Sequence, residues 1–248
     1  MQVRRLIRYL LINALVTLAT TVPGSAQEFS LSMGGESSLA LSSIQLLALV
    51  TVLSLVPGLA IMITCFPFLV TVLSILRQAI GLQQSPPNML IVSLALFLTY
   101  FVMEPVFSES WQLGISPFVE GQISIELAFQ KAMEPFRIFM AARIDAETFS
   151  KLADLRVGAE STELLDPGAS LSLLVPSFLL SEIERAFQIG FLIFLPFLII
   201  DLVVAAVLMS MGMMMVPPAI VSLPFKLAFF VVADGWTLIS EALVKGYF

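Results

Sequence analysis

The sequence predicts an all-α integral membrane protein of kinked helical hairpins with an extracytoplasmic helical segment. Of its 248 residues, 58% are hydrophobic and only 12% are charged, whereas soluble globular proteins carry about 25% charged residues. The mean hydropathy is +1.00. So many apolar side chains cannot all be buried in one water-soluble core, and the bilayer must solvate part of them. Prolines interrupt the apolar runs, which predicts kinked helices.

Residues 1–26 are interpreted as a cleavable signal peptide. Arg4, Arg5 and Arg8 form a positive start, residues 9–22 form an apolar stretch, and small residues end it at Ala26. This order is typical of an export signal. The alternative is a first transmembrane anchor. Export implies a bacterial plasma membrane with the mature N-terminus outside, followed by a flexible segment over residues 27–38.

Residues 39–103 are predicted to form the N-terminal hydrophobic helices. No charged residue occurs over residues 37–76, and these 40 residues exceed the roughly 20 that cross a bilayer once. Pro57 and Pro67 interrupt the run, which therefore holds either one long kinked helix or two shorter ones. A turn is expected over residues 81–88. A second helix is expected from Met89 to Met103, closed by Glu104-Pro105.

Residues 104–185 differ in composition and are predicted to be an acidic periplasmic segment. They contain 13 acidic and 6 basic residues, and so many charges lie outside the hydrocarbon. The segment includes an amphipathic stretch over residues 123–144. Arg77 is the only charge in the first short loop, which places that loop in the cytoplasm and residues 104–185 on the other side. Residues 186–248 are predicted to be C-terminal hydrophobic helices.

Composition argues against an enzyme, a cofactor protein and a nucleic-acid binder. The chain has no histidine and a single cysteine, Cys65, so the common zinc, haem and Cys–His sites and an intrachain disulfide are not expected. The net charge is −6, and no basic patch is interleaved with aromatic residues. No paired acid and base residues stand out.

The most unusual local feature is a methionine-rich stretch that ends in two prolines. Five of the twelve methionines fall within residues 209–215. A flexible core helix is one interpretation, because methionine fills irregular gaps. However, a break with glycine and Pro217-Pro218 at membrane depth is tolerated only beside protein or a water-filled cavity. A deformable apolar collar around a pore is the other interpretation. The candidate gate residues are Met209, Met211, Gly212, Met213, Met214 and Met215.

Asp201 and Lys226 each stand alone between apolar stretches, where an ionised group usually marks a function or a partner. If the chain reverses near Met213 and Met214, both residues lie 12 to 13 positions from the turn. A helical hairpin would then bring them to the same depth as an intramembrane charge pair. The alternative is that each lies near an interface and extends its charge to water.

A polar stripe precedes the C-terminal hydrophobic helices. Glu184, Arg185 and Gln188 share a helical face, and Glu182 lies on a neighbouring face, where it can pair with Arg185 at i, i+3. Such a stripe is usually solvated. Because it continues directly into a hydrophobic helix, these residues are also candidates for a subunit interface or an aqueous lumen.

Two blocks of sequence resemble the FliP family of type III secretion export-gate subunits, which includes the virulence-system homologues. The C-terminal block consists of residues 176–178, 181–183, 186–191, 201–204, 211–218, 222–226 and 234–236. The N-terminal block consists of residues 76–81, 86–88 and 94–99. Cys65-Phe66-Pro67-Phe68 departs from the family, which has Thr-Arg there, so a role for that arginine is not carried over.

The resemblance implies a ring of five copies, capped by FliR, surrounded by FliQ, and working with FlhA and FlhB. It implies that the ring transports unfolded flagellar proteins across the inner membrane within the basal body, and that it is lifted partly out of the bilayer. The family's methionine-rich loop constricts the pore, which corresponds here to Met211 and Met213–Met215. The export signal and the long extracytoplasmic segment favour the flagellar branch of the family.

A different class of function is a small-molecule or ion transporter that uses Asp201 and Lys226 as a coupling pair. Such a transporter would need a binding site near the middle of the membrane, often with inverted repeats. The sequence contains no internal repeat.

Overall fold

The computed structural model describes residues 36–82, 86–155, 165–213 and 215–248, with side chains from residue 43 onward. The chain divides into two compact units, Met1–Val52 and Leu53–Phe248, and the second contains the core and the candidate site described below. The predicted signal peptide and most of the predicted flexible segment lie outside the described residues. The all-α prediction is confirmed, since the described residues form helices and no strand.

Helices α2 (Glu36–Met62) and α3 (Phe66–Ile80) show that the long uncharged run forms two helices. The break follows Met62, because α2 continues through Pro57. Pro67 instead lies in the first turn of α3, where proline removes no helical hydrogen bond. Helix α3 ends at Gly81, whose φ of 88° suits glycine, and the Gly81 N–H donates to the Gln78 carbonyl at 3.0 Å.

Helix α4 (Asn88–Ser110) passes through Glu104-Pro105, so the prediction that this pair ends the helix was wrong. A π-helical turn, η1 (Trp111–Ile115), and helix α5 (Ser116–Val119) extend it further. Met103 and Ser110 are buried on either side of the proline, and the Ser110 hydroxyl donates to the Ala132 carbonyl at 2.8 Å. Packing on a neighbouring helix thus outweighs the cost of about 3 kcal/mol for an interior proline.

Helices α6 (Ile125–Arg143) and α7 (Ala146–Asp154) follow, and each begins with a side-chain cap. Asp145 accepts a hydrogen bond from the Thr148 N–H at 2.8 Å, which satisfies a free amide of the first turn of α7. This bond, reinforced by the Thr148 hydroxyl, lowers the pKa of Asp145. The amphipathic stretch predicted over residues 123–144 therefore corresponds to α6.

Helix α8 (Leu171–Ser210) is 40 residues long and continues through Pro176 and Pro196. The segment boundary that the sequence places between residues 185 and 186 lies inside it. Helices α9 (Pro218–Val232) and α10 (Gly235–Lys245) return the chain, with a bend of 62° between them. Asp234, at the bend, has the left-handed φ of 48°.

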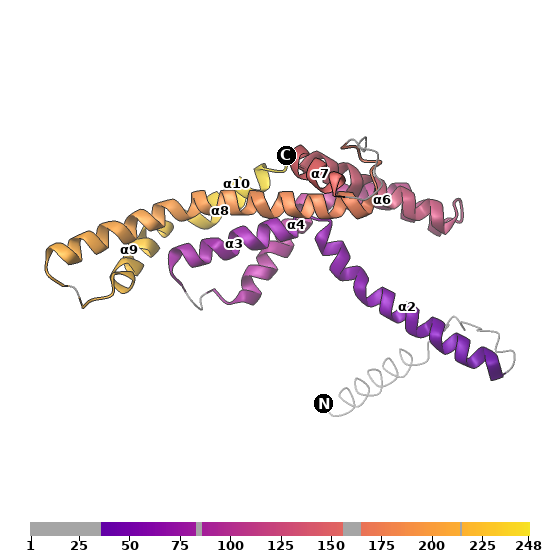
Figure 1. Cartoon of the computed structure of the whole chain (residues 1–248), viewed down its shortest axis with the longest axis horizontal. Helices are drawn as coiled ribbons and strands as arrows, with labels where there is room; N and C mark the ends of the chain where they lie inside the picture. Colours follow the sequence, from indigo (N-terminus) through magenta and orange to yellow (C-terminus); the bar gives the residue numbers. More distant parts are fainter. Residues whose placement is uncertain (1–35, 83–85, 156–164, 214) are drawn as a thin grey trace, which may run out of the picture. The chain divides into compact units, whose positions relative to one another are not determined.

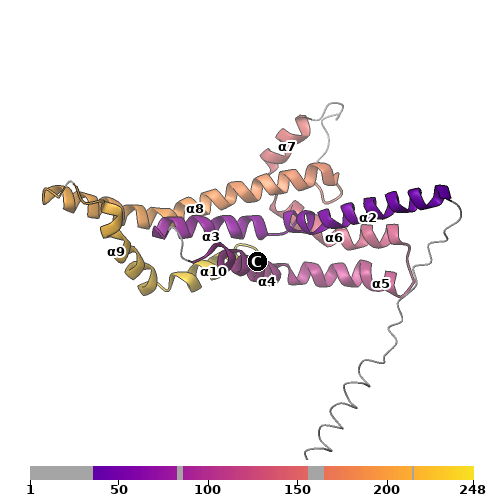
Figure 2. The same ribbon diagram turned by 90° about the horizontal axis from the view of Figure 1, so that it is seen from below.

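The core lies where α3 packs along α8 (Figures 1 and 2), covered by α4, α9 and α10. Gly190 allows this approach, because a Cβ atom there would lie 2.5 Å from Cδ1 of Ile75. A second apolar cluster joins α6 and α7 to the first half of α8, with Met140, Phe149 and Phe178 buried in it. Helix α8 is thus the axis on which the other helices are positioned.

Three stretches among the described residues are long and apolar enough to cross a membrane: Ser43–Met62, Asn88–Val119 and Leu171–Ser210. The bent pair of α9 and α10 would provide a fourth. At 1.5 Å per residue, α8 is about 60 Å long, twice the roughly 30 Å of bilayer hydrocarbon. Most of its apolar surface is uncovered in a single chain, so lipid or other protein must cover it.

Candidate functional site

The candidate site is the hairpin of α8 and α9, whose turn carries the methionine-rich stretch. Gly212 has a φ of 74°, which a side-chain-bearing residue rarely adopts. The Met213 N–H donates to the Leu208 carbonyl at 3.0 Å, and the Gly212 N–H donates to the Met209 carbonyl at 3.1 Å. These two bonds form a Schellman cap, and Pro217 and Pro218 then begin α9. The sequence therefore fixes where the hairpin turns.

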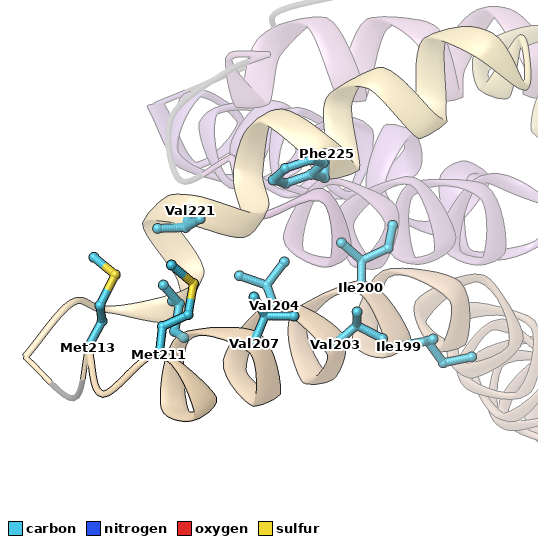
Figure 3. A pocket seen from close by; sticks show the side chains of 10 residues that line it. Ile199, Ile200, Val203, Val204, Val207, Met211, Met213, Val221 and Phe225 are labelled. Carbon is cyan, nitrogen blue, oxygen red and sulfur yellow. The ribbon is translucent and has the colours of Figure 1, made fainter.

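The methionines of this turn project away from the helical core. Met209, Met211 and Met213 are exposed, and Met215 is 98% exposed. Figure 3 shows Met213 at the tip of the turn and Met211 beside it. Met214, which the sequence also singles out, lies outside the described residues. Exposed thioethers at the end of a hairpin form a soft apolar surface that can deform against another molecule.

Asp201 and Lys226 face each other across the hairpin. Lys226 Nζ lies 2.6 Å from Asp201 Oδ2, and the two side chains are 7% and 33% exposed. The hairpin therefore brings the two lone charges of the C-terminal region into contact. Loss of Asp201 would leave the buried Lys226 ammonium as an unpaired charge, which is costly.

Two further groups, which the sequence pattern does not predict, complete this ion pair. The hydroxyl of the fully buried Ser222 donates to Asp201 Oδ1 at 2.6 Å. Lys226 Nζ also donates to the Ala79 carbonyl at 3.1 Å. That carbonyl is among the last four of α3, which lack partners within the helix. We call Asp201, Lys226, Ser222 and the Ala79 carbonyl the anchor cluster, because they join α8, α9 and α3 at one point.

Between the anchor cluster and the turn, an open apolar cavity of about 570 Å³ lies between the two arms of the hairpin. Figure 3 shows Val204 and Val207 of α8 on one side and Val221 and Phe225 of α9 on the other. Met211 and Met213 line its end. Near the turn, the side chains of α8 and α9 therefore do not fully pack against each other.

A second buried polar cluster changes the interpretation of Glu182. The sequence placed Glu182 at a subunit interface or lumen, but its side chain has no exposed surface within a single chain. Arg143 Nε donates to Glu182 Oε1 at 3.0 Å, and the Tyr247 hydroxyl donates to Oε2. Arg185, the partner predicted from spacing, lies 3.8 Å away. Arg143 is closer because the end of α6 packs against α8.

Arg143 and Tyr247 also fasten the end of the chain to the core. The Arg143 guanidinium donates to the Gly246 carbonyl at 2.7 Å and lies 4.0 Å from the centre of the Tyr247 ring. Burial and the neighbouring Glu182 charge raise the pKa of Tyr247 far above its usual range. The phenol therefore remains a hydrogen-bond donor. Sequence spacing gave no indication of this cluster, because its members are far apart along the chain.

The other members of the polar stripe lie at the surface. Glu184 and Gln188 are exposed, and the Gln188 amide donates to Glu184 Oε1 at 3.2 Å. Arg185 is partly exposed. These three side chains are therefore accessible to water or to another molecule.

The described residues offer little for catalytic chemistry. No group of three or more potential metal ligands occurs among residues 36–82, 86–155, 165–213 and 215–248. Cys65 is fully buried, and burial raises the pKa of its thiol to about 12. A thiol that stays protonated is a poor nucleophile.

These features define a helical membrane protein whose distinctive element is a charge-paired, methionine-tipped hairpin. The sequence model described as the FliP family matches residues 49–243, and the chain belongs to that family. It is 45% identical to the flagellar biosynthetic protein FliP of Caulobacter vibrioides, over 97% of this chain and 91% of the relative.

Two further relatives carry the same name. The FliP protein of Agrobacterium fabrum is 43% identical, with 96% of this chain and 100% of the relative covered. The FliP protein of Bacillus subtilis is 45% identical, with 83% of this chain and 92% of the relative covered. The chain thus spans nearly the full length of these three relatives, each named for flagellar biosynthesis.

Proposed function

We propose that this protein is the pore-forming subunit of the flagellar type III protein export gate. In this role it moves unfolded flagellar proteins across the bacterial inner membrane at the flagellar basal body and provides the base on which the flagellum assembles. Family membership, the names of the relatives and the apolar helices support an export component in a membrane.

The observation that carries the proposal is the position of the methionines. Met211, Met213 and Met215 are exposed at the end of a hairpin whose turn is fixed by Gly212 and whose arms are joined by the Asp201–Lys226 ion pair. In a ring of copies, such turns would form a collar of unbranched thioethers. The collar would exclude ions from the pore at rest, and it would deform around a polypeptide because methionine has three flexible side-chain torsions.

The proposed assembly contains five copies of this chain, with FliR and FliQ completing the gate and FlhA and FlhB acting as further export components. The uncovered apolar faces of α8 and α9 support such an assembly, because Phe187, Leu202 and Phe229 are all exposed in one chain. Within the ring, Glu184, Arg185 and Gln188 would face a neighbouring copy or the lumen. Residues 104–185 would lie on the periplasmic side.

The anchor cluster favours a gate over a small-molecule transporter. A coupling pair must exchange partners as its substrate binds and leaves. Here Lys226 also bonds to the Ala79 carbonyl and Asp201 also bonds to Ser222, which suits a fixed pair. Solute uptake by the protein alone in vesicles would instead support the transporter.

The test is the ion conductance of the purified gate complex carrying glycine at positions 213, 214 and 215. We expect a large rise in resting conductance, because glycine leaves the centre of the collar open. Met89→Gly is the control, since Met89 is also exposed but lies in the first turn of α4. Conductance equal to that of the unmodified complex would contradict the gate proposal.

A further inference from the structure

The anchor cluster lies at the base of the projecting part of the hairpin. Helix α3 packs beside α8, where Ile75 lies against Gly190, and its last turn ends at the cluster through the Ala79 carbonyl. Beyond this point Leu202, Val207 and Ile220 are exposed. The methionine turn therefore sits at the end of two arms that extend past the end of α3.

Apolar packing alone does not fix the spacing of these arms. The cavity of about 570 Å³ separates Val204 and Val207 on α8 from Val221 and Phe225 on α9. Side chains across a gap of this size lose their mutual dispersion contacts. The position of α9 relative to α8 must therefore depend on the contacts at the base of the arms.

At the base, Phe197 of α8 packs against Phe229 and Phe230 of α9, and the contacts nearest the projecting arms are polar and directional. Ser222 has no exposed surface, and its hydroxyl can donate either to Asp201 Oδ1 at 2.6 Å or to the Ala219 carbonyl at 3.2 Å. The shorter bond to the charged carboxylate is the stronger one. This bond holds Asp201 Oδ1 while Lys226 holds Oδ2, so the carboxylate is bound at both oxygens to α9.

Lys226 extends the connection to α3. Its ammonium is placed at the C-terminal end of that helix, where the helix dipole favours a positive charge. Gly81 lies beside the ammonium, since a Cβ atom at this position would be in ordinary contact with Lys226 Nζ at 3.9 Å, and its φ of 88° is what favours glycine there. One side chain thus ties α9 to both α8 and α3.

We propose that the anchor cluster sets the position of the methionine turn, and that Ser222 is a positioning residue for closing the pore. This inference rests on the proposed gate function. Without the Ser222 hydroxyl, the carboxylate loses one of its bonds to α9, and the unpacked arms can separate or shift. The turn then spends more time away from its closed position, although the subunit itself stays folded around α3 and the first part of α8.

The experiment compares the resting ion conductance of purified gate complexes carrying Ser222→Ala, Ser222→Thr or Ser210→Ala. Ser222→Ala removes the hydroxyl. Ser222→Thr retains it. Ser210→Ala is the matched control on the same hairpin, because the Ser210 hydroxyl is exposed and bonds only locally, to the Val207 carbonyl at 2.7 Å.

We expect Ser222→Ala to raise the resting conductance about ten-fold, as the loss of a hydrogen bond to a charged group would do. The resting conductance of the Ser222→Thr and Ser210→Ala complexes should stay close to that of the unmodified complex. All three variants should assemble in equal yield. A Ser222→Ala conductance equal to that of the unmodified complex, alongside a leaking methionine-to-glycine complex, would overturn the positioning role and leave the gate intact.

Loss of assembly in Ser222→Ala would also overturn the inference, because the serine would then hold the subunit together instead of positioning its turn. The inference would also be overturned if Ser210→Ala raised the resting conductance as much as Ser222→Ala does. If the methionine-to-glycine complex does not leak, the gate proposal itself fails. The two failures are therefore distinguishable within one set of recordings.

Discussion

Arg143 and Glu182 form an ion pair that is sealed inside the chain. Arg143 Nε lies 3.0 Å from Glu182 Oε1, and the Glu182 side chain has no exposed surface. The pair connects the end of α6 to the first third of α8. Because Arg143 also bonds to the Gly246 carbonyl, it joins the end of the chain to the same point.

Replacing Arg143 with methionine should destabilise the protein strongly. The variant leaves Glu182 as a buried charge whose remaining cation, Arg185, is 3.8 Å away, and breaking a buried pair in this way costs about 3–5 kcal/mol. The measurement is the free energy of unfolding in detergent. Lys131→Met is the control, because the Lys131–Glu134 pair is half exposed and such pairs contribute about 0–1 kcal/mol. Equal losses in both variants would refute a special role for the buried pair.

Tyr247 should make the stability of the protein fall at alkaline pH. Burial, and then the Glu182 charge, raise the pKa of its phenol in the folded state above the unfolded value of 10.0. Above pH 10 the unfolded chain has therefore lost a proton that the folded chain keeps, and stability decreases as pH rises. Tyr247→Phe should lower stability at neutral pH and flatten the alkaline decline. An unchanged slope would show that other groups cause the decline.

Gly114→Ala should disrupt the contact between the π-helical turn η1 and α6. An added Cβ atom would lie 2.6 Å from the Ala128 carbonyl oxygen and from the Ala132 backbone nitrogen, which cannot move as a side chain can. Forcing an extra carbon into a packed contact typically costs about 1–3 kcal/mol. Gly58→Ala is the control, since nothing lies within 4 Å of that Cβ position. Thermal unfolding that is equally affected by both changes would contradict this packing.

Cys65 should not react with a maleimide in the folded protein. Its thiol is fully buried and its pKa is raised to about 12, so almost none of the reactive thiolate forms near neutral pH. Labelling should occur only after denaturation in detergent. Labelling of the native protein at the denatured rate would mean that the start of α3 opens readily. If the prediction holds, the native cysteine does not interfere with cysteines introduced elsewhere.

The hairpin was predictable from sequence because its signals are local and chemically distinct. Two lone charges, each 12 to 13 positions from Met213 and Met214, indicated that Asp201 and Lys226 would lie at the same depth. Ser222 was not predictable, because serine in an apolar helix usually bonds to a carbonyl one turn earlier, as Ser177 does here. Nothing in the local pattern distinguishes the two cases.

The errors arose where tertiary packing overrides local sequence. Glu104-Pro105 is a strong helix-ending signal, yet α4 continues because Met103 and Ser110 are buried against neighbouring helices. Glu182 looked like part of a solvated stripe because its i, i+3 neighbour is Arg185. Its closer partners, Arg143 and Tyr247, lie 39 and 65 residues away. Spacing along one helix carries no information about such distant contacts.

The most direct measurement of the gate is cross-linking between copies that carry Met213→Cys in the purified complex. Met213 is exposed at the tip of the turn, and a pore-lining collar brings this position in neighbouring copies together. We expect Met213→Cys copies to form disulfide-linked dimers under mild oxidation, since each copy offers one accessible thiol. Copies with Val232→Cys should form few such disulfides, because Val232 is exposed at the far end of α9. If Met213→Cys copies stay monomeric and instead react with a lipid-soluble probe, the turn does not line a shared pore.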